Sequence, residues 1–82
     1  MLVKLRLLLA DLPAPSGLIE VELEAGSTVQ QALEAVQKLH SIEDPEGLLP
    51  ASMFIINQKP VELGAVLQEQ DELLVMRILG GG

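Results

Sequence analysis

Residues 73–82 are Leu73-Leu74-Val75-Met76-Arg77-Ile78-Leu79-Gly80-Gly81-Gly82. The first seven are typical of a β-strand, because Leu, Val and Ile pack well on a pleated sheet. Three glycines follow, and glycine lets a backbone pass where a Cβ would clash. A strand that runs into such a tail offers a partner one functional group, the terminal α-carboxylate. We therefore expect the carboxylate of Gly82 to be the reactive site and the remaining residues to hold it.

Two alternating segments open the chain. In residues 2–9 the apolar Val3, Leu5 and Leu7 alternate with Lys4 and Arg6, which indicates a half-buried strand. Residues 11–17 are rich in Pro, Ser and Gly and end this strand, and alternation returns over residues 19–24. The two segments predict a hairpin in which the glutamates of the second strand face Lys4 and Arg6.

A helix follows the hairpin. Ser27 with Gln30 three residues later fits a capping box, in which each side chain satisfies an exposed backbone N–H. The apolar positions that then recur at helical spacing are Val29, Ala32, Leu33, Val36 and Leu39. They predict one amphipathic helix of about three turns. His40, just past it, is expected to be a surface residue without a role.

The second half predicts a loop and three more strands. The expected segments are a loop around Pro45 and Gly47, a strand 53–57, a turn 57–60, a brief strand 61–63, an irregular segment 64–71 and a last strand 72–79. The resulting fold class is α+β, a mixed sheet packed on one main helix in a single domain. The predicted core comprises Val3, Leu5, Ile19, Val21, Val29, Leu33, Val36, Ile55, Leu73 and Val75.

The last strand also leaves an apolar surface unexplained. Leu73 and Val75 should face the helix, which turns their neighbours to the opposite side of the sheet. The apolar side chains expected there are Leu8, Leu74, Met76 and Ile78. Contiguous exposed aliphatic residues mark binding surfaces, and Met suits a surface that meets several partners. The alternative is that the loop over residues 40–52 covers them.

The bulk composition limits the classes of function. The 82 residues are enough for one small domain, and the net charge of −7, without a basic stripe, argues against nucleic acid and favours a partner with a basic docking surface. The absence of cysteine excludes disulfides, thiolate metal sites and cysteine nucleophiles. No segment is long enough to span a membrane, and no signal-peptide pattern opens the chain. We expect a cytoplasmic protein that binds no membrane.

The order of elements and three short motifs resemble one family. The motifs are the turn over residues 56–61, the Asp71-Glu72 start of the last strand, and Gly81-Gly82. Over essentially its whole length the chain resembles the ubiquitin-like, β-grasp sulfur carriers, which include the molybdopterin synthase small subunit and the thiamine-pathway carrier. The resemblance implies a β-grasp domain over residues 1–79 and a flexible glycine tail over residues 80–82.

The resemblance also implies a chemistry. A free α-carboxylate has a pKa of about 3.5 and is a poor electrophile at neutral pH. A ubiquitin-activating-type adenylating enzyme would use ATP to form an acyl-adenylate at Gly82, and a sulfide or persulfide would convert it to a thiocarboxylate. Gly80 and Gly81 would thread the tail through the active sites of this enzyme and of a synthase. The chain itself would bind no cofactor or metal, and we do not expect an enzyme, since no acid–base pair or metal-ligand set has convergent spacing.

Several alternatives stay open. The chain length and the long segment 40–52 resemble the molybdopterin type, which implies molybdenum or tungsten cofactor synthesis with the molybdopterin synthase large subunit as acceptor. The turn at Asn57 and residues 77–79 resemble the thiamine type, which implies thiazole synthase as acceptor. Gly80 departs from both patterns. A ubiquitin-like modifier would use the same terminus to form isopeptide bonds, and a bare interaction domain would leave the tail inert. Arg77 is either a solubilising charge or a guide for the tail that pairs with an acidic group on the activating enzyme.

Overall fold

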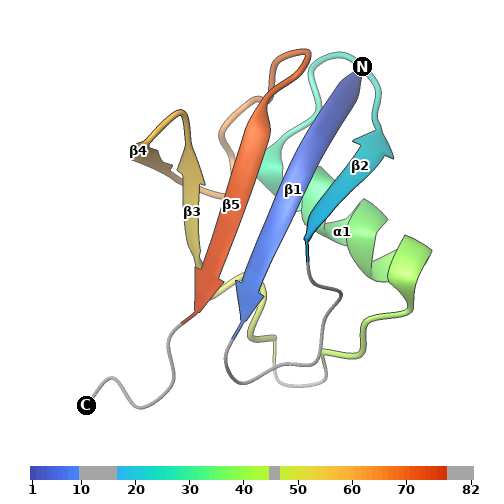
Figure 1. Cartoon of the computed structure of the whole chain (residues 1–82), viewed down its shortest axis with the longest axis vertical. Coiled ribbons are helices and arrows are strands. Elements are labelled where there is room, and N and C mark those ends of the chain that lie inside the picture. The colour runs from blue at the N-terminus through green and yellow to red at the C-terminus, as the bar shows by residue number, and fades with distance from the viewer. Residues whose placement is uncertain (10–16, 45–46, 78–82) are drawn as a thin grey trace.

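The computed structural model describes residues 1–9, 17–44 and 47–77. Within these ranges five strands form one mixed sheet in the order β2-β1-β5-β3-β4, and a helix lies behind one of its faces (Figure 1). The elements are β1 (Leu2–Leu9), β2 (Leu18–Glu22), α1 (Val29–His40), β3 (Met53–Ile56), β4 (Lys59–Val61) and β5 (Glu72–Arg77). The predicted α+β class and element order are confirmed.

The two central strands, β1 and β5, run parallel and supply the middle of the core. Leu5 lies opposite Leu73 and Leu7 opposite Val75, and all four side chains are buried. The antiparallel partner β2 adds two more buried positions on the same side, and α1 covers them with Val29, Ala32, Leu33 and Val36. Each of these three strands therefore buries alternate side chains on the face that α1 covers, as a sheet with one covered face requires.

Strand β3 differs from the prediction in its phase. Ile55, predicted in the core, is half-buried and points away from the helix, whereas Phe54 and Ile56 are buried. The reason is the register with β5, which places Phe54 opposite Val75 and Ile56 opposite Leu73. A shift of one residue in a strand exchanges its two faces.

The helix begins one residue later than the predicted capping box. Thr28, not Ser27, is the N-cap: Gln31 donates its backbone N–H to the Thr28 hydroxyl at 3.4 Å, and the Gln31 side chain accepts from the Thr28 backbone N–H at 2.8 Å. Ser27 is instead buried and donates its hydroxyl to the carbonyl of Glu24 at 2.7 Å. The N–H groups of Val29 and Gln30 are bound by carbonyls of residues 65 and 63, so the first turn is fixed by tertiary contacts.

Three further details of the second half depart from the prediction. Leu39, predicted on the apolar face of the helix, is 63% exposed, and His40 is the last helical residue and exposed. The turn after β3 is shorter than expected: Asn57 and Gln58 alone form it, both at positive φ, so β4 starts at Lys59 rather than Val61. The segments 47–52 and 62–71 are not merely connections, because each buries one leucine in the core, Leu49 and Leu67.

Candidate functional site

The face of the sheet that α1 does not cover is the candidate site, and we call it the open face. Strand alternation places the even-numbered residues of β1 and β5 and the odd-numbered residues of β3 on it. Cross-strand pairing then arranges these residues in rows that run across the sheet. The rows change in chemistry from one end of the strands to the other.

The first row is entirely apolar. It comprises Leu8, Met76 and Met53, because Met76 pairs with Leu8 on one side and with Met53 on the other. Leu8 is 50% exposed and Met53 58% exposed, and Met76 between them is half-buried. We call these three residues the apolar row. Their exposure shows that the described part of the 40–52 loop does not cover them.

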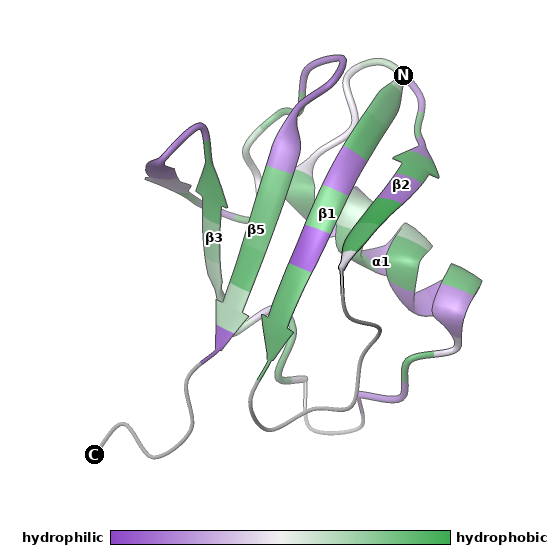
Figure 2. Cartoon of the chain, viewed as in Figure 1, coloured by the Kyte–Doolittle hydropathy of each residue, from purple (hydrophilic) through white to green (hydrophobic). Residues whose placement is uncertain are grey.

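The next two rows become increasingly polar. Leu74 lies between Arg6 and Ile55, and further along Lys4 lies between Glu20 and Glu72. The expected pairing of Lys4 with a glutamate of β2 is thus present, whereas Arg6 faces Leu18. In Figure 2 hydrophilic bands cross β1, and β5 is hydrophobic between a hydrophilic first and last residue.

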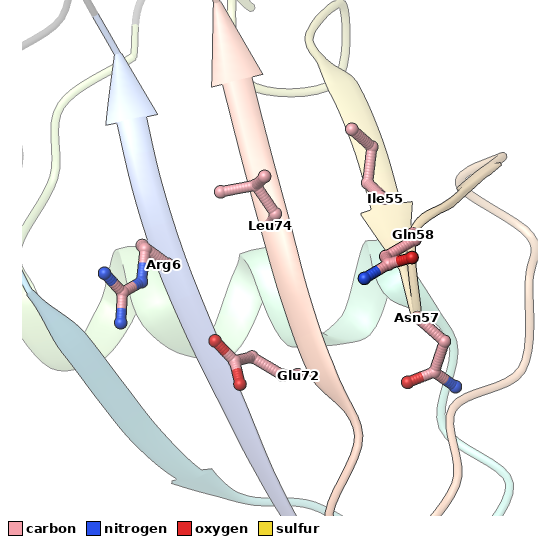
Figure 3. A pocket seen from close by; sticks show the side chains of 6 residues that line it. All are labelled: Arg6, Ile55, Asn57, Gln58, Glu72 and Leu74. Atoms are coloured by element: carbon pink, nitrogen blue, oxygen red, sulfur yellow. The ribbon is translucent and has the colours of Figure 1, made fainter.

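A hollow of about 340 Å³ lies on the open face where the polar rows begin. Its lining residues are Arg6, Ile55, Asn57, Gln58, Glu72 and Leu74. In Figure 3 the Arg6 guanidinium is directed toward β2 and the Glu72 carboxylate toward β1, while the amide of Gln58 lies across β5 from both. Because these polar groups do not converge on one point, the hollow does not have the arrangement of an acid–base site.

The apolar row lies at the end of the sheet where β5 stops. Arg77 is the last residue of β5, directly after Met76, and Gly82 follows it by five residues. Arg77 is half-buried and pairs with Leu9, so alternation places it on the side of Val75 rather than on the open face. The predicted site residues Ile78, Gly80, Gly81 and Gly82 lie outside the described residues, as does the boundary between domain and tail.

The structure thus brings three of the predicted binding residues together and adds others. Leu8, Leu74 and Met76 share the open face as expected, and whether they bind a partner stays a prediction. Met53 and Ile55 join them, and sequence reasoning missed both. The signal that identifies them is the pairing of β3 with β5, which a run of consecutive apolar residues does not reveal.

The described ranges also bear on two other kinds of site, one for a metal ion and one for a membrane. No group of three or more His, Cys, Asp or Glu side chains lies close enough together there to hold a metal ion. No helix within the same ranges is long and apolar enough to cross a membrane.

The family model described as the ThiS family matches residues 12–82 of the chain. The chain belongs to the ThiS family. Comparison of this ThiS-family chain with curated protein sequences gave no match. The chain is similar to several solved protein chains. SAMP1 from Haloferax volcanii shares 26% sequence identity over the whole of both chains, with a TM-score of 0.79.

The second similar structure is that of H. volcanii small archaeal modifier protein 1. It is 25% identical, has a TM-score of 0.73, and the alignment covers 92% of the ThiS-family chain and 94% of the other chain. The family match and the likeness of these structures identify the mixed sheet and helix as the ubiquitin-like β-grasp fold. The fold implied by the sequence resemblance is therefore confirmed.

Proposed function

We propose that this ThiS-family protein is a sulfur carrier whose reactive group is the α-carboxylate of Gly82. An adenylating enzyme of the ubiquitin-activating type catalyses attack of the carboxylate oxygen on the α-phosphorus of ATP, and pyrophosphate leaves. Sulfide then attacks the acyl carbon of the adenylate, and AMP leaves. When the donor is a persulfide, attack of its outer sulfur gives an acyl disulfide, and a second thiol reduces this bond, becomes a disulfide itself and releases the sulfur on the carrier. The product is a thiocarboxylate at Gly82, which carries the sulfur to a second enzyme.

The observation that carries this proposal is the position of β5. This strand is hydrogen-bonded on both sides, to β1 and β3, so its end at Arg77 is held firmly by the fold. The five residues from there to Gly82 reach at most about 18 Å when fully extended. An enzyme that acts on Gly82 must therefore lie close to this end of the sheet, where the apolar row is exposed.

The apolar row and Leu74 are the surface that we propose both partner enzymes bind. They lie on the one face of the sheet that α1 leaves open, and they adjoin the strand that leads to the tail. Binding there positions the tail without any catalytic side chain from the carrier. ATP is used by the partner, and the carrier needs no metal or cofactor of its own.

For the acceptor we propose the large subunit of molybdopterin synthase, on the resemblance of the long 40–52 segment to molybdopterin-type carriers. The alternative acceptor within the same chemistry is thiazole synthase in thiamine synthesis. The two are distinguished by which purified synthase, supplied with its precursor, removes the sulfur from the carrier.

A second candidate function is supported by the similar structures. They belong to a protein named small archaeal modifier protein 1, and the present chain is similar to it over nearly all its length. A modifier uses the same adenylated terminus, but a lysine amine takes up the acyl group, AMP leaves and an isopeptide bond forms. We propose this as the main alternative to sulfur transfer.

One experiment separates these functions. The carrier is incubated with ATP, the adenylating enzyme of the same organism and a sulfide donor, and its C-terminal peptide is analysed by mass spectrometry. A sulfur carrier exchanges one oxygen for sulfur at Gly82 and returns to its starting mass when the synthase and precursor are added. A modifier instead appears joined to lysines of other proteins in bands that resist reducing agent. If neither product forms, both proposals are wrong.

A further inference from the structure

Two of the three methionines of the chain lie side by side on the open face. Met53, the first residue of β3, lies directly opposite Met76 of β5 and is 58% exposed. Met76 is half-buried between Met53 and Leu8. The remaining methionine, Met1, is half-buried and packs against the core. The three thioethers are therefore unequally accessible to a dissolved reagent, and Met53 is the most exposed.

An exposed thioether reacts with a hydroperoxide in a balanced two-electron step. A sulfur lone pair attacks the peroxide oxygen, the O–O bond breaks, the sulfur becomes a sulfoxide, and the peroxide is reduced to water or an alcohol. The sulfoxide is polar, and peptide methionine sulfoxide reductases restore the thioether with two electrons from cysteine thiols, which become a disulfide while the oxygen leaves as water. The rate at which a methionine is oxidised depends on access to its sulfur, so Met53 should be oxidised faster than Met76 and Met1.

We propose that Met53 is a site of reversible oxidation that weakens binding of the adenylating enzyme to the open face. The inference rests on the proposed function, because the apolar row must be the docking surface for the switch to matter. A sulfoxide at Met53 places a strong hydrogen-bond acceptor in a row that is otherwise Leu8 and Met76. A partner that covers the row must remove water from this oxygen, which costs binding free energy unless the partner offers a donor.

The fold tolerates this modification. The Met53 side chain lies on the face opposite the core, and its backbone pairing with Met76 does not involve the sulfur. The sulfoxide oxygen therefore stays in water in the free carrier. Oxidation therefore changes the free energy of binding, because a partner must remove that water, and it leaves the free energy of unfolding nearly unchanged.

The first part of the test uses the folded full chain alone and hydrogen peroxide. Peptide mapping by mass spectrometry follows each methionine, because oxygen gain at Met53 and oxygen-to-sulfur exchange at Gly82 change the intact mass by nearly the same amount. Met53 should be oxidised about fivefold or more faster than Met76 and Met1, as its exposure predicts. The thermal midpoint of the singly oxidised chain should match that of the untreated chain. Equal rates at the three methionines, or slower oxidation at Met53, would overturn the proposal.

The second part measures affinity for the adenylating enzyme of the same organism, before and after peroxide has oxidised Met53 but not Met76. The dissociation constant should rise about tenfold or more and return after treatment with methionine sulfoxide reductases. In Met53→Leu the ratio of treated to untreated affinity should be close to one, whereas Met76→Leu should keep the peroxide response. An unchanged dissociation constant for the chain oxidised at Met53 would overturn the switch. If the untreated chain neither binds this enzyme nor is adenylated by it, the proposed function itself fails, and the switch fails with it.

Discussion

At the scale of single residues, burial separates two leucines of the same helix. Leu33 is 3% exposed and Leu39 is 63% exposed. Leu33→Ala should lower the free energy of unfolding by about 2–5 kcal/mol, because truncation of a buried leucine loses apolar contacts and leaves a cavity. Leu39→Ala is the matched control and should cost less than about 0.5 kcal/mol. Urea denaturation measures both, and equal losses would contradict the packing described for α1.

Backbone conformation at Ser41 gives a second prediction at this scale. Ser41 caps the end of α1 in the left-handed region, at φ 52 and ψ 44, where a Cβ is unfavourable. Ser41→Gly should raise the free energy of unfolding by about 0.5–1 kcal/mol, because glycine adopts this conformation without strain. A glycine introduced inside the helix, by Glu34→Gly, should lower the free energy of unfolding by a similar amount. A stabilised Glu34→Gly or a destabilised Ser41→Gly in thermal unfolding would argue against this cap.

At the scale of elements, alternation in the sequence was sufficient to predict which face of a strand is buried, provided that polar residues mark the other face. β1 has Lys4 and Arg6 between its buried positions, and its predicted phase is confirmed. β3 consists of four apolar residues, Met53–Ile56, so nothing in the segment defines which side faces the helix. Its pairing with β5 decides the phase, and this long-range contact is what the local pattern lacks. Because the phase of β3 was predicted wrongly, Ile55 was assigned to the core and Met53 was not included in the candidate site.

The start of the helix shows the same limitation. Ser27 and Thr28 each have a glutamine three residues later, so the sequence offers two capping boxes one residue apart. The carbonyls of residues 63 and 65 select between them, since they bind the N–H groups of the first two helical residues. Sequence spacing therefore predicted the kind of cap correctly, and the choice of residue came from a tertiary contact.

The observed cap makes a prediction of its own. Thr28→Ala should lower the free energy of unfolding by about 1 kcal/mol, because the hydroxyl that accepts from the Gln31 N–H is lost. Thr28→Ser keeps that oxygen and should retain most of the stability. Guanidinium denaturation of the two variants checks this, and equal destabilisation would show that the threonine methyl rather than its hydroxyl matters.

At the scale of the whole molecule, the fold covers one face of the sheet and exposes the other. Met76→Glu places a charge in the apolar row, which a docking partner must desolvate. Affinity for the adenylating enzyme should fall about tenfold or more, while the thermal midpoint changes little. Gln30→Glu adds the same charge on the exposed surface of α1 and is the control. Equal affinities for the two variants in a titration would place the docking surface elsewhere.

If the open face binds the enzyme and Gly82 reacts, binding and adenylation should be lost independently of each other. Every buried core residue of the described ranges lies between Val3 and Val75, so deletion of Gly81 and Gly82 should leave the thermal midpoint unchanged. The shortened chain should still bind the adenylating enzyme, because the apolar row is intact, but ATP–pyrophosphate exchange dependent on the carrier should disappear. Met76→Glu should show the reverse, with weak binding but normal exchange once the carrier is saturating. If removal of the two glycines abolishes binding as completely as Met76→Glu does, the tail itself supplies the affinity, and the open face does not hold the complex together.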